Sequence, residues 1–131
     1  MGCKCLDSDI IIDFLRGKVE AVRYMERAVE EGELCTTVLN VFEVVYGAYK
    51  YGKNVDRTVE FFKTLKVLGL DLDSAILAGK LLSELESKGK PIEMRDLIIG
   101  SIALSNGCEV VTGNVRHFSK ISGLKVCNWK G

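Results

Sequence analysis

The chain has 131 residues, of which 47% are hydrophobic. This length and composition suit one domain with one buried core, so we expect a single domain over residues 1–131. The 18 basic and 18 acidic residues balance, which excludes the general attraction to nucleic acid that a strongly basic domain has. A polyanionic ligand would therefore have to meet a local basic patch or a metal ion.

Five cysteines occur, an odd number without the CxxC spacing of zinc sites: Cys3, Cys5, Cys35, Cys108 and Cys127. Most lie in apolar, strand-like runs, and we interpret them as reduced core thiols of a cytoplasmic protein. A structural disulfide or a metal site is the alternative. The N-terminus has no basic region followed by a long apolar run, and no stretch approaches the roughly 20 apolar residues of a membrane span. We therefore expect a soluble protein without a membrane partner.

Short apolar runs alternate along the chain with longer segments of helical period. The runs short enough for strands are Cys3–Leu6, Leu34–Thr36, Lys66–Leu70, Glu109–Val111 and Leu124–Cys127. The segments that suit helices are Ile10–Arg16, Val19–Glu31, Val38–Tyr51, Val55–Thr64, Ser74–Lys88 and Asp96–Asn106. Glycines stand where helices should stop, at Gly32, Gly52, Gly89 and Gly107. The alternation predicts an α/β fold, a parallel sheet covered by helices on both faces.

Ligands of such sheets bind beyond the carboxyl ends of the strands, so we searched those ends for polar residues. In "CLDSDIIIDFLRG", Asp7 directly follows the first strand and Asp9 lies two residues on. Asp9 suits the N-cap of the next helix. Asp7 would lie in the crevice if the first strand is central, where a buried charge requires a positive partner.

The segment "TTVLNVFEVVYGAYK" predicts an amphipathic helix with Glu43 at the border of its apolar arc. The arc consists of Val38, Leu39, Phe42, Val45, Tyr46 and Tyr49. A border glutamate suits either a solvated flank or an inward position. The aromatic content here and in "VEFFKTL" exceeds the needs of one small core, which is compatible with a dimer face, a peptide groove or ordinary packing.

In "PIEMRDLIIGSIALSNG", Asp96 lies in the first turn of an otherwise apolar helix. A carboxylate there also favours the helix dipole without any further role. Gly100 and Ala103 share its face, which predicts close packing of this helix on the sheet.

The stretch "VVTGNVRHF" predicts a buried strand, a polar turn and a short helix. It contains Asn114 and His117, the only histidine in the chain. Asn114 follows the strand, and Asp7, Glu43 and Asp96 also lie at element ends that this topology brings to one edge. Carboxylates that share a pocket repel one another, and divalent cations relieve this repulsion. Oxygen ligands favour Mg²⁺ or Mn²⁺ over zinc.

These motifs resemble those of PIN-domain ribonucleases, and within them the VapC-type toxins of toxin–antitoxin pairs. The matching stretches are "LDSDIIIDFLRG", "TTVLNVFEVVYGA", "IEMRDLIIGSIAL" and "VVTGNVRHFSKISGLKV". The resemblance implies a three-layer α/β/α sandwich with a short central parallel sheet, and a cytoplasmic endoribonuclease that uses Mg²⁺ or Mn²⁺. It places Asp7, Glu43 and Asp96 at the three core acidic positions, as metal ligands, and Asn114 at the fourth.

The implied reaction is hydrolysis of an RNA phosphodiester by a metal-activated water. The resemblance also implies a homodimer and a small antitoxin partner. Basic residues flank the acidic positions and suit either phosphate contacts or a solvated surface: Arg16, Arg95, Arg116 and Lys120. His117 suits a substrate contact or a half-buried turn.

Two other interpretations stay open. A strand that ends in D-x-D, as in "DSD", also occurs in aspartate phosphatases of the haloacid-dehalogenase type, although the later "TGNVRHF" lacks the acid that those enzymes need. A non-catalytic PIN-like scaffold that binds RNA or a partner is the second, because Asn114 removes one negative charge from the fourth position. The RNA target and the number of metal ions are not predictable from this sequence.

Overall fold

The computed structural model describes residues 2–131, which form five strands and seven helices. The strands are β1 (Cys3–Leu6), β2 (Glu33–Thr37), β3 (Lys66–Leu68), β4 (Cys108–Val111) and β5 (Val126–Cys127). The helices are α1 (Ser8–Leu15), α2 (Val19–Glu31), α3 (Val38–Lys50), α4 (Val55–Phe62), α5 (Leu72–Ser87), α6 (Met94–Ser105) and α7 (Val115–Phe118). The elements expected from hydrophobic periodicity are therefore present, with boundaries shifted by a few residues.

The strands form one parallel sheet in the order β3-β2-β1-β4-β5. The chain adds β2 and β3 on one side of β1 and returns to add β4 and β5 on the other, so the strand order reverses at β1. Parallel sheets of this kind place their ligand crevice beyond the carboxyl ends at that reversal. Asp7 follows β1 and Thr112 follows β4, so both lie at this position.

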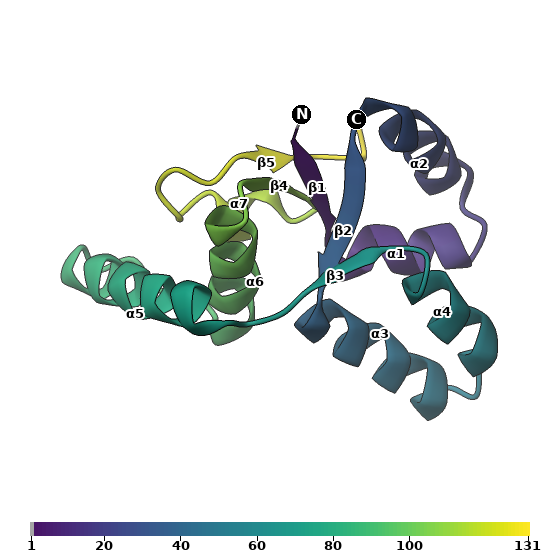
Figure 1. Ribbon diagram of the computed structural model, residues 1–131, viewed down its shortest axis with the longest axis horizontal. Coiled ribbons are helices and arrows are strands. Elements are labelled where there is room, and N and C mark those ends of the chain that lie inside the picture. The colour runs from purple at the N-terminus through teal and green to yellow at the C-terminus, as the bar shows by residue number, and fades with distance from the viewer. Residues whose placement is uncertain (1) are drawn as a thin grey trace.

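Helices cover both faces of the sheet, as Figure 1 shows. On one face, Leu6 and Val111 pack in a cluster with apolar residues of α1, α2 and α3. On the other face, Cys5 and Val110 pack against Ile99 and Ile102 of α6, and α5 lies on the outer side of α6. Apolar side chains alternate between the two clusters along β1 and β4 because successive strand residues point to opposite faces. The three-layer α/β/α prediction is confirmed.

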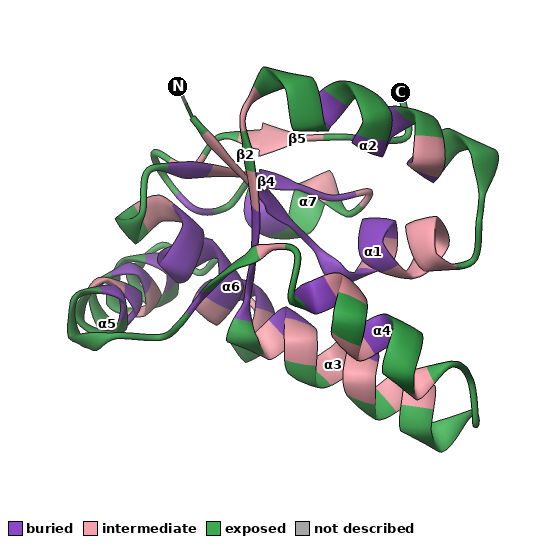
Figure 2. Cartoon of the chain, turned by 45° about the vertical axis from the view of Figure 1, so that its right-hand side comes forward, coloured by how far each residue is buried: buried purple, intermediate pink, exposed green. Residues whose placement is uncertain are grey.

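The apolar arc of α3 is largely exposed, so ordinary packing, one of the three alternatives left open for this segment, does not account for its aromatic residues. Phe42, Tyr46 and Tyr49 are 64%, 55% and 69% exposed. Asn40 and Val44 are the buried residues of this helix, and Figure 2 shows most of α3 as intermediate or exposed. The reason is that α3 turns a mixed polar and apolar side toward the sheet edge, so its most apolar arc faces outward.

Two glycines behave differently from the prediction. Gly32 ends α2 with φ 170° and ψ −175°, which is extended backbone and not the left-handed C′ conformation. A Cβ there would lie 2.8 Å from the carbonyl oxygen of Gly2, so close chain approach explains the glycine. Gly100 faces the C-terminal segment and not the sheet. Because it has no Cβ, Ile121 and Leu124 of that segment can pack against it.

Within residues 2–131, none of the helices combines the length and the apolar character of a transmembrane segment.

Candidate active site

Asp7 is held rigidly at the carboxyl end of the central strand. It is the N-cap of α1, and its side chain is 1% exposed. Its Oδ1 accepts hydrogen bonds from the backbone N–H of Ser8 (2.8 Å) and from Nδ2 of Asn40 (3.0 Å), and its Oδ2 accepts one from the Thr112 hydroxyl (2.8 Å). A buried carboxylate needs such partners. Groups from α1, α3 and the end of β4 therefore fix one carboxylate.

Glu43 reaches the same place from α3. This helix follows β2 without a loop, because Thr37 ends the strand and caps the helix, where its hydroxyl accepts from the backbone N–H of Asn40 (3.2 Å). Glu43 lies one turn after Asn40, on the same side of the helix. Its Oε1 accepts a 2.6 Å hydrogen bond from the Ser8 hydroxyl. The border glutamate thus points inward.

Asp96 is the third carboxylate and lies in the first turn of α6, as expected. It is 4% exposed although it carries a charge. Three acidic side chains from α1, α3 and α6 therefore meet beyond the carboxyl end of β1.

Arg95 lies at the centre of this group and pairs with all three carboxylates. Its Nη2 lies 2.7 Å from Asp7 Oδ1, its Nε 2.5 Å from Glu43 Oε2 and its Nη1 2.8 Å from Asp96 Oδ1. Burial alone would lower the pKa of Arg95, but its hydrogen bond to Glu43 and the charge of Asp7 outweigh this and raise the pKa. The guanidinium is permanently charged, so three carboxylates and one cation leave a formal charge of minus two.

The contacts of Arg95 indicate whether the three carboxylates could hold a metal ion. Three carboxylates directed at one cation form the oxygen-only donor set that Mg²⁺ and Mn²⁺ prefer. Among residues 2–131, no three acidic side chains have ligand atoms that all lie within 4.8 Å of one another. The three carboxylates are spread around the guanidinium, which is wider than a metal ion. The donors fit a divalent ion, and Arg95 would have to leave this position for the ion to bind.

Asn114 and His117 lie at the rim. Asn114 is exposed, and its backbone N–H donates to the Thr112 hydroxyl (3.0 Å). His117 Nδ1 lies 3.4 Å from Asp96 Oδ2, and its side chain is 52% exposed. The structure therefore brings His117 to the acidic cluster and places the backbone of Asn114 two hydrogen bonds from Asp7, through the Thr112 hydroxyl.

The remaining basic residues expected near the site are exposed, and the structure places them differently. Arg16 follows α1 and Arg116 lies on α7 beside His117. The ammonium group of Lys120 donates to the Pro91 carbonyl (2.7 Å), just before α6. Arg116 and Lys120 thus lie near the rim formed by α6 and α7.

Sequence reasoning missed the residues that orient Asp7. It assigned Arg95 to a phosphate contact or a solvated surface, and did not predict its pairing with the three carboxylates. Asn40 could have been found, because it precedes Glu43 by three residues and so shares its helix face. Thr112 directly follows β4 and Ser8 lies two residues after β1, but single hydroxyls at such positions are common. The inward direction of Arg95 depends on how α6 is docked.

Asp9 does not cap α1, because Asp7 does. Asp9 Oδ2 accepts instead from the backbone N–H of Gly113 (2.7 Å) and from the Trp129 indole (3.3 Å). A Cβ at Gly113 would lie 2.7 Å from this carboxylate oxygen, so glycine permits the contact. Asp9 therefore ties the loop after β4 and the C-terminal segment to α1.

Comparisons with known proteins agree with this fold. The model of the PIN domain family matches residues 4–124. The tRNA(fMet)-specific endonuclease VapC of Salmonella typhimurium is 33% identical over 128 residues, which cover 95% of this chain and 96% of that protein. The chain belongs to the PIN-domain family, among its VapC-type members, which confirms the resemblance.

Solved structures give the same result. The DNA-bound VapBC of Salmonella typhimurium matches with a TM-score of 0.81 and 30% identity over 98% of this chain and 99% of that chain. VapBC2 of Rickettsia felis, bound to a DNA fragment from its promoter, matches with a TM-score of 0.84 and 23% identity over 97% and 98% of the two chains. The second likeness supports the fold alone.

Proposed function

We propose that this protein is a Mg²⁺- or Mn²⁺-dependent endoribonuclease and the toxin of a VapBC-type toxin–antitoxin pair. The observation that carries the proposal is the meeting of Asp7, Glu43 and Asp96, from three separate elements, around one cation. The similarity to proteins named VapC ribonucleases supports it.

Asp7 and Asp96 would hold the metal ion directly, and Glu43 directly or through water. The ion would supply positive charge at the scissile phosphate and lower the pKa of a bound water. Asn40, Ser8 and Thr112 orient the carboxylates, so these residues fix the donor positions before any ligand arrives. Asn114 supplies an uncharged amide and not a carboxylate at the fourth position, which would limit binding of a second ion.

Arg95 is the basic residue best placed to contact the phosphate, because it already lies among the donors. If an ion takes its position, the guanidinium stays within a side-chain length and can pair with a phosphate oxygen. Arg116, Lys120 and His117 would contact phosphates at the rim, and Arg16 would contact RNA farther along α1.

The test is RNA cleavage by Asp7→Asn and Asp96→Asn variants. Substrates are transfer RNAs, including initiator transfer RNA, because a relative is named for it. We expect each variant to lose Mn²⁺-dependent cleavage by on the order of 100-fold or more, since each removes a charged donor. Unchanged cleavage by either variant would exclude the assignment.

Asp73→Asn is the matched control. Asp73 also lies in the first turn of a helix, α5, but it is exposed and forms none of the ion pairs of the acidic cluster. Titration with Mn²⁺ by calorimetry separates the catalytic proposal from a non-catalytic scaffold: binding without cleavage of any RNA would favour the scaffold.

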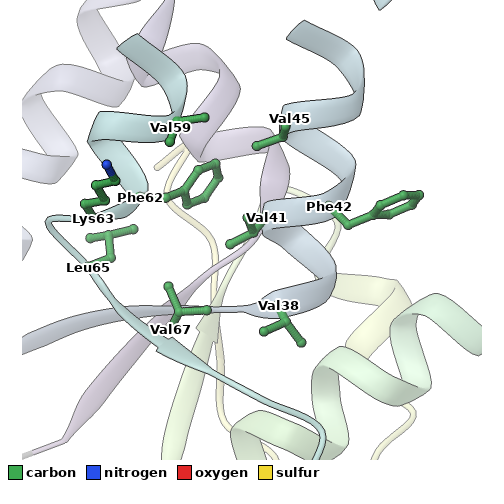
Figure 3. A pocket seen from close by; sticks show the side chains of 9 residues that line it. All are labelled: Val38, Val41, Phe42, Val45, Val59, Phe62, Lys63, Leu65 and Val67. Carbon is green, nitrogen blue, oxygen red and sulfur yellow. The ribbon is translucent and has the colours of Figure 1, made fainter. Parts of the chain in front are cut away.

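We also propose a homodimer and a small antitoxin protein as partners. Apolar side chains line a groove of about 530 Å³ between α3, α4 and β3 (Figure 3): Val38, Val41, Phe42, Val45, Val59, Phe62, Leu65 and Val67, with Lys63 at its edge. Solved relatives are named VapBC or toxin–antitoxin complexes. An apolar groove of this kind fits an amphipathic helix of a protein partner.

A further inference from the structure

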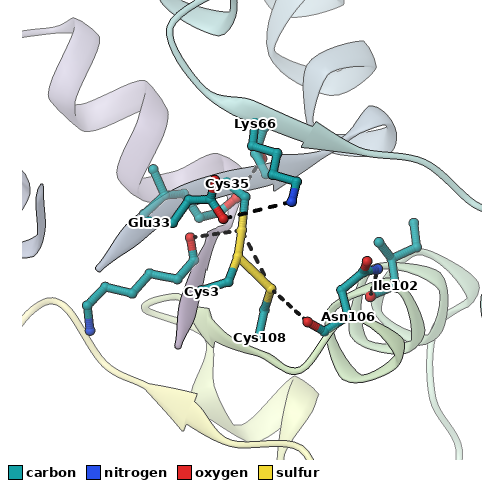
Figure 4. Close-up of a disulfide and its surroundings, with 10 residues drawn as sticks. Cys3, Glu33, Cys35, Lys66, Ile102, Asn106 and Cys108 are labelled. Carbon is teal, nitrogen blue, oxygen red and sulfur yellow. Dashed lines mark hydrogen bonds and ion pairs between the residues drawn. A yellow bond between two sulfur atoms is a disulfide. The ribbon is translucent and has the colours of Figure 1, made fainter. Parts of the chain in front are cut away.

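Three cysteines meet at the amino-terminal edge of the sheet, opposite the acidic cluster. Cys3 and Cys108 are the first residues of the neighbouring strands β1 and β4 and are partners in register. Cys35 lies on β2, on the other side of β1. Figure 4 shows the three sulfur atoms side by side. The interpretation of these three as reduced core thiols is therefore wrong, because Cys3 is paired with both of the others.

Cys3 can bond either neighbour. Its Cα lies 4.5 Å from that of Cys108 and 6.6 Å from that of Cys35, and both separations fall in the range that disulfides span. A sulfur atom forms one disulfide, so the two pairings are alternatives. The sulfur atoms of Cys35 and Cys108 lie 3.6 Å apart, so whichever thiol is left out stays next to the bond.

A structural metal site is the competing interpretation of this cluster. Among the described residues, the group that could ligate a soft ion contains these three thiols alone, whereas structural zinc sites use four ligands. The nearest charged side chains at the adjoining cavity, Glu33 and Lys66, pair with each other at 3.8 Å. The sulfur positions thus favour a covalent link over a complete metal site.

The cluster is accessible from solvent. A cavity of about 310 Å³ opens at this edge, and Cys3 and Cys108 line it. Cys3 is partly exposed, whereas Cys35 is fully buried. A small oxidant therefore reaches Cys3 first.

We propose that Cys3, Cys35 and Cys108 form a reversible redox site in which Cys3 is the shared partner of two alternative disulfides. A small-molecule disulfide is the oxidant. The Cys3 thiolate attacks one sulfur of this disulfide, forms a mixed disulfide and releases one thiolate. The thiolate of Cys35 or Cys108 then attacks the Cys3 sulfur and releases the second. The two protons of the protein thiols end on the two released thiols, so the protein loses two electrons and the oxidant gains two.

The same chemistry lets the bond move. In the Cys3–Cys35 form, the Cys108 thiolate is placed to attack Cys3 and release Cys35, with no net oxidation. The link joins β1 to β2 or to β4, and these are the strands that lead into Asp7, α3 and the Thr112–Asn114 turn. Oxidation therefore ties the strands that carry the acidic cluster at their far ends.

The experiment is disulfide mapping of the full chain after incubation with oxidised glutathione. Denaturation, alkylation and trypsin digestion place the five cysteines on five peptides, because Lys4, Arg16, Arg27, Lys50, Arg95, Arg116, Lys125 and Lys130 separate them. We expect two of the five thiols to be lost, with Cys3 joined to Cys35 in some molecules and to Cys108 in others. Dithiothreitol should restore all five.

Variants identify the shared partner. Cys108→Ser should leave the Cys3–Cys35 link, and Cys35→Ser the Cys3–Cys108 link. Cys3→Ser should form neither, and no Cys35–Cys108 bond, because two strand spacings separate these backbones by roughly 9–10 Å. Cys127→Ser, outside the cluster, should behave as the parent chain does. A Cys35–Cys108 bond in Cys3→Ser, or five free thiols in the oxidised parent chain, would overturn the proposal.

Zinc titration of the reduced chain supplies the other decisive result. If one equivalent of Zn²⁺ protects all three thiols from alkylation and blocks oxidation, the cluster is a metal site and the redox proposal fails. We expect no such protection.

Discussion

At the scale of single residues, the charge balance of the acidic cluster depends on Arg95. Asp7 and Asp96 are almost fully buried, and like charges in so small a volume raise the free energy of the folded state. Arg95 offsets this with contacts of 2.5–2.8 Å to three carboxylates. Under the proposed function, a divalent ion and this guanidinium would compete for the same donors.

Arg95→Met should separate the two effects. The variant leaves three uncompensated carboxylates, so we expect the metal-free protein to lose on the order of 2–4 kcal/mol of unfolding free energy. Mn²⁺ affinity should rise roughly tenfold or more, since no cation has to be displaced. Thermal unfolding in EDTA measures the first change, and calorimetric Mn²⁺ titration the second.

Arg116→Met is the control for Arg95→Met, because Arg116 is exposed and lies on the neighbouring α7. It should change neither quantity appreciably. Equal Mn²⁺ affinity in Arg95→Met and the parent chain would contradict the competition.

Cys5 differs in reactivity from Cys3, although the two lie on the same strand face. Burial, with a smaller contribution from the charge of Asp7, raises the pKa of Cys5 to about 12. The thiolate is the reactive form, so we expect native Cys5 to resist iodoacetamide at pH 8–9 while reduced Cys3 reacts. Peptide mapping after limited alkylation measures both; equal labelling would contradict this order.

At the scale of elements, α6 depends on a close approach to the C-terminal segment. A Cβ at Gly100 would lie 2.3 Å from Cδ1 of Ile121 and 3.3 Å from Cδ2 of Leu124. Ile121 is 2% exposed and has little space to move. We expect Gly100→Ala to lower the unfolding free energy by about 1–3 kcal/mol, as over-packing does, which chemical denaturation measures.

Gly79→Ala is the matched control in α5. Its added Cβ meets nothing within 4 Å, so the higher helix propensity of alanine should stabilise the protein by up to about 1 kcal/mol. Opposite signs at the two glycines are the expected result, and a stabilising Gly100→Ala would show that the C-terminal segment does not pack on α6.

The outer face of α3 predicts a second contrast. Phe42→Ser removes an exposed aromatic ring and should change the unfolding free energy by no more than about 0.5 kcal/mol. Val44→Ala empties a buried position, 5% exposed, and should cost about 1–3 kcal/mol. Urea denaturation compares the two. A large loss in Phe42→Ser would mean that this face is part of the folding core and not a surface for a partner.

At the scale of the whole molecule, the two clusters lie at opposite edges of one short sheet. Cys3 and Asp7 are four residue steps apart along β1, a span of roughly 13 Å at the usual strand rise. The acidic cluster lies where strand order reverses, and the thiol cluster where the same strands begin. The central strands thus carry chemistry at both ends.

Oxidation should therefore change global stability. A Cys3–Cys35 link closes 32 residues and a Cys3–Cys108 link closes 105. Restricting the unfolded chain in this way contributes up to about 4–5 kcal/mol. We expect the oxidised protein to unfold at a higher temperature than the reduced protein in scanning calorimetry, and Cys3→Ser to show no difference between the two conditions.

The sequence by itself determined the elements and their order. Alternation of strand-like and helical periods depends on local spacing of apolar residues, and it is sufficient to predict a covered parallel sheet. Asp7 and Asp96 were identifiable because each is a carboxylate at an element end, and Glu43 because it borders the apolar arc of its helix. All three were also identifiable because the motifs resemble those of a known family.

Only the tertiary structure decided which side chains meet. The direction of Arg95 depends on how α6 docks beside α1 and α3, and the exposure of Phe42 depends on which side of α3 meets the sheet edge. Cys3, Cys35 and Cys108 are separated by 32 and 73 residues, so strand order and register alone bring them together. Periodicity along the chain reports one helix face or one strand face at a time, whereas charge pairing and thiol contact arise between faces that packing selects.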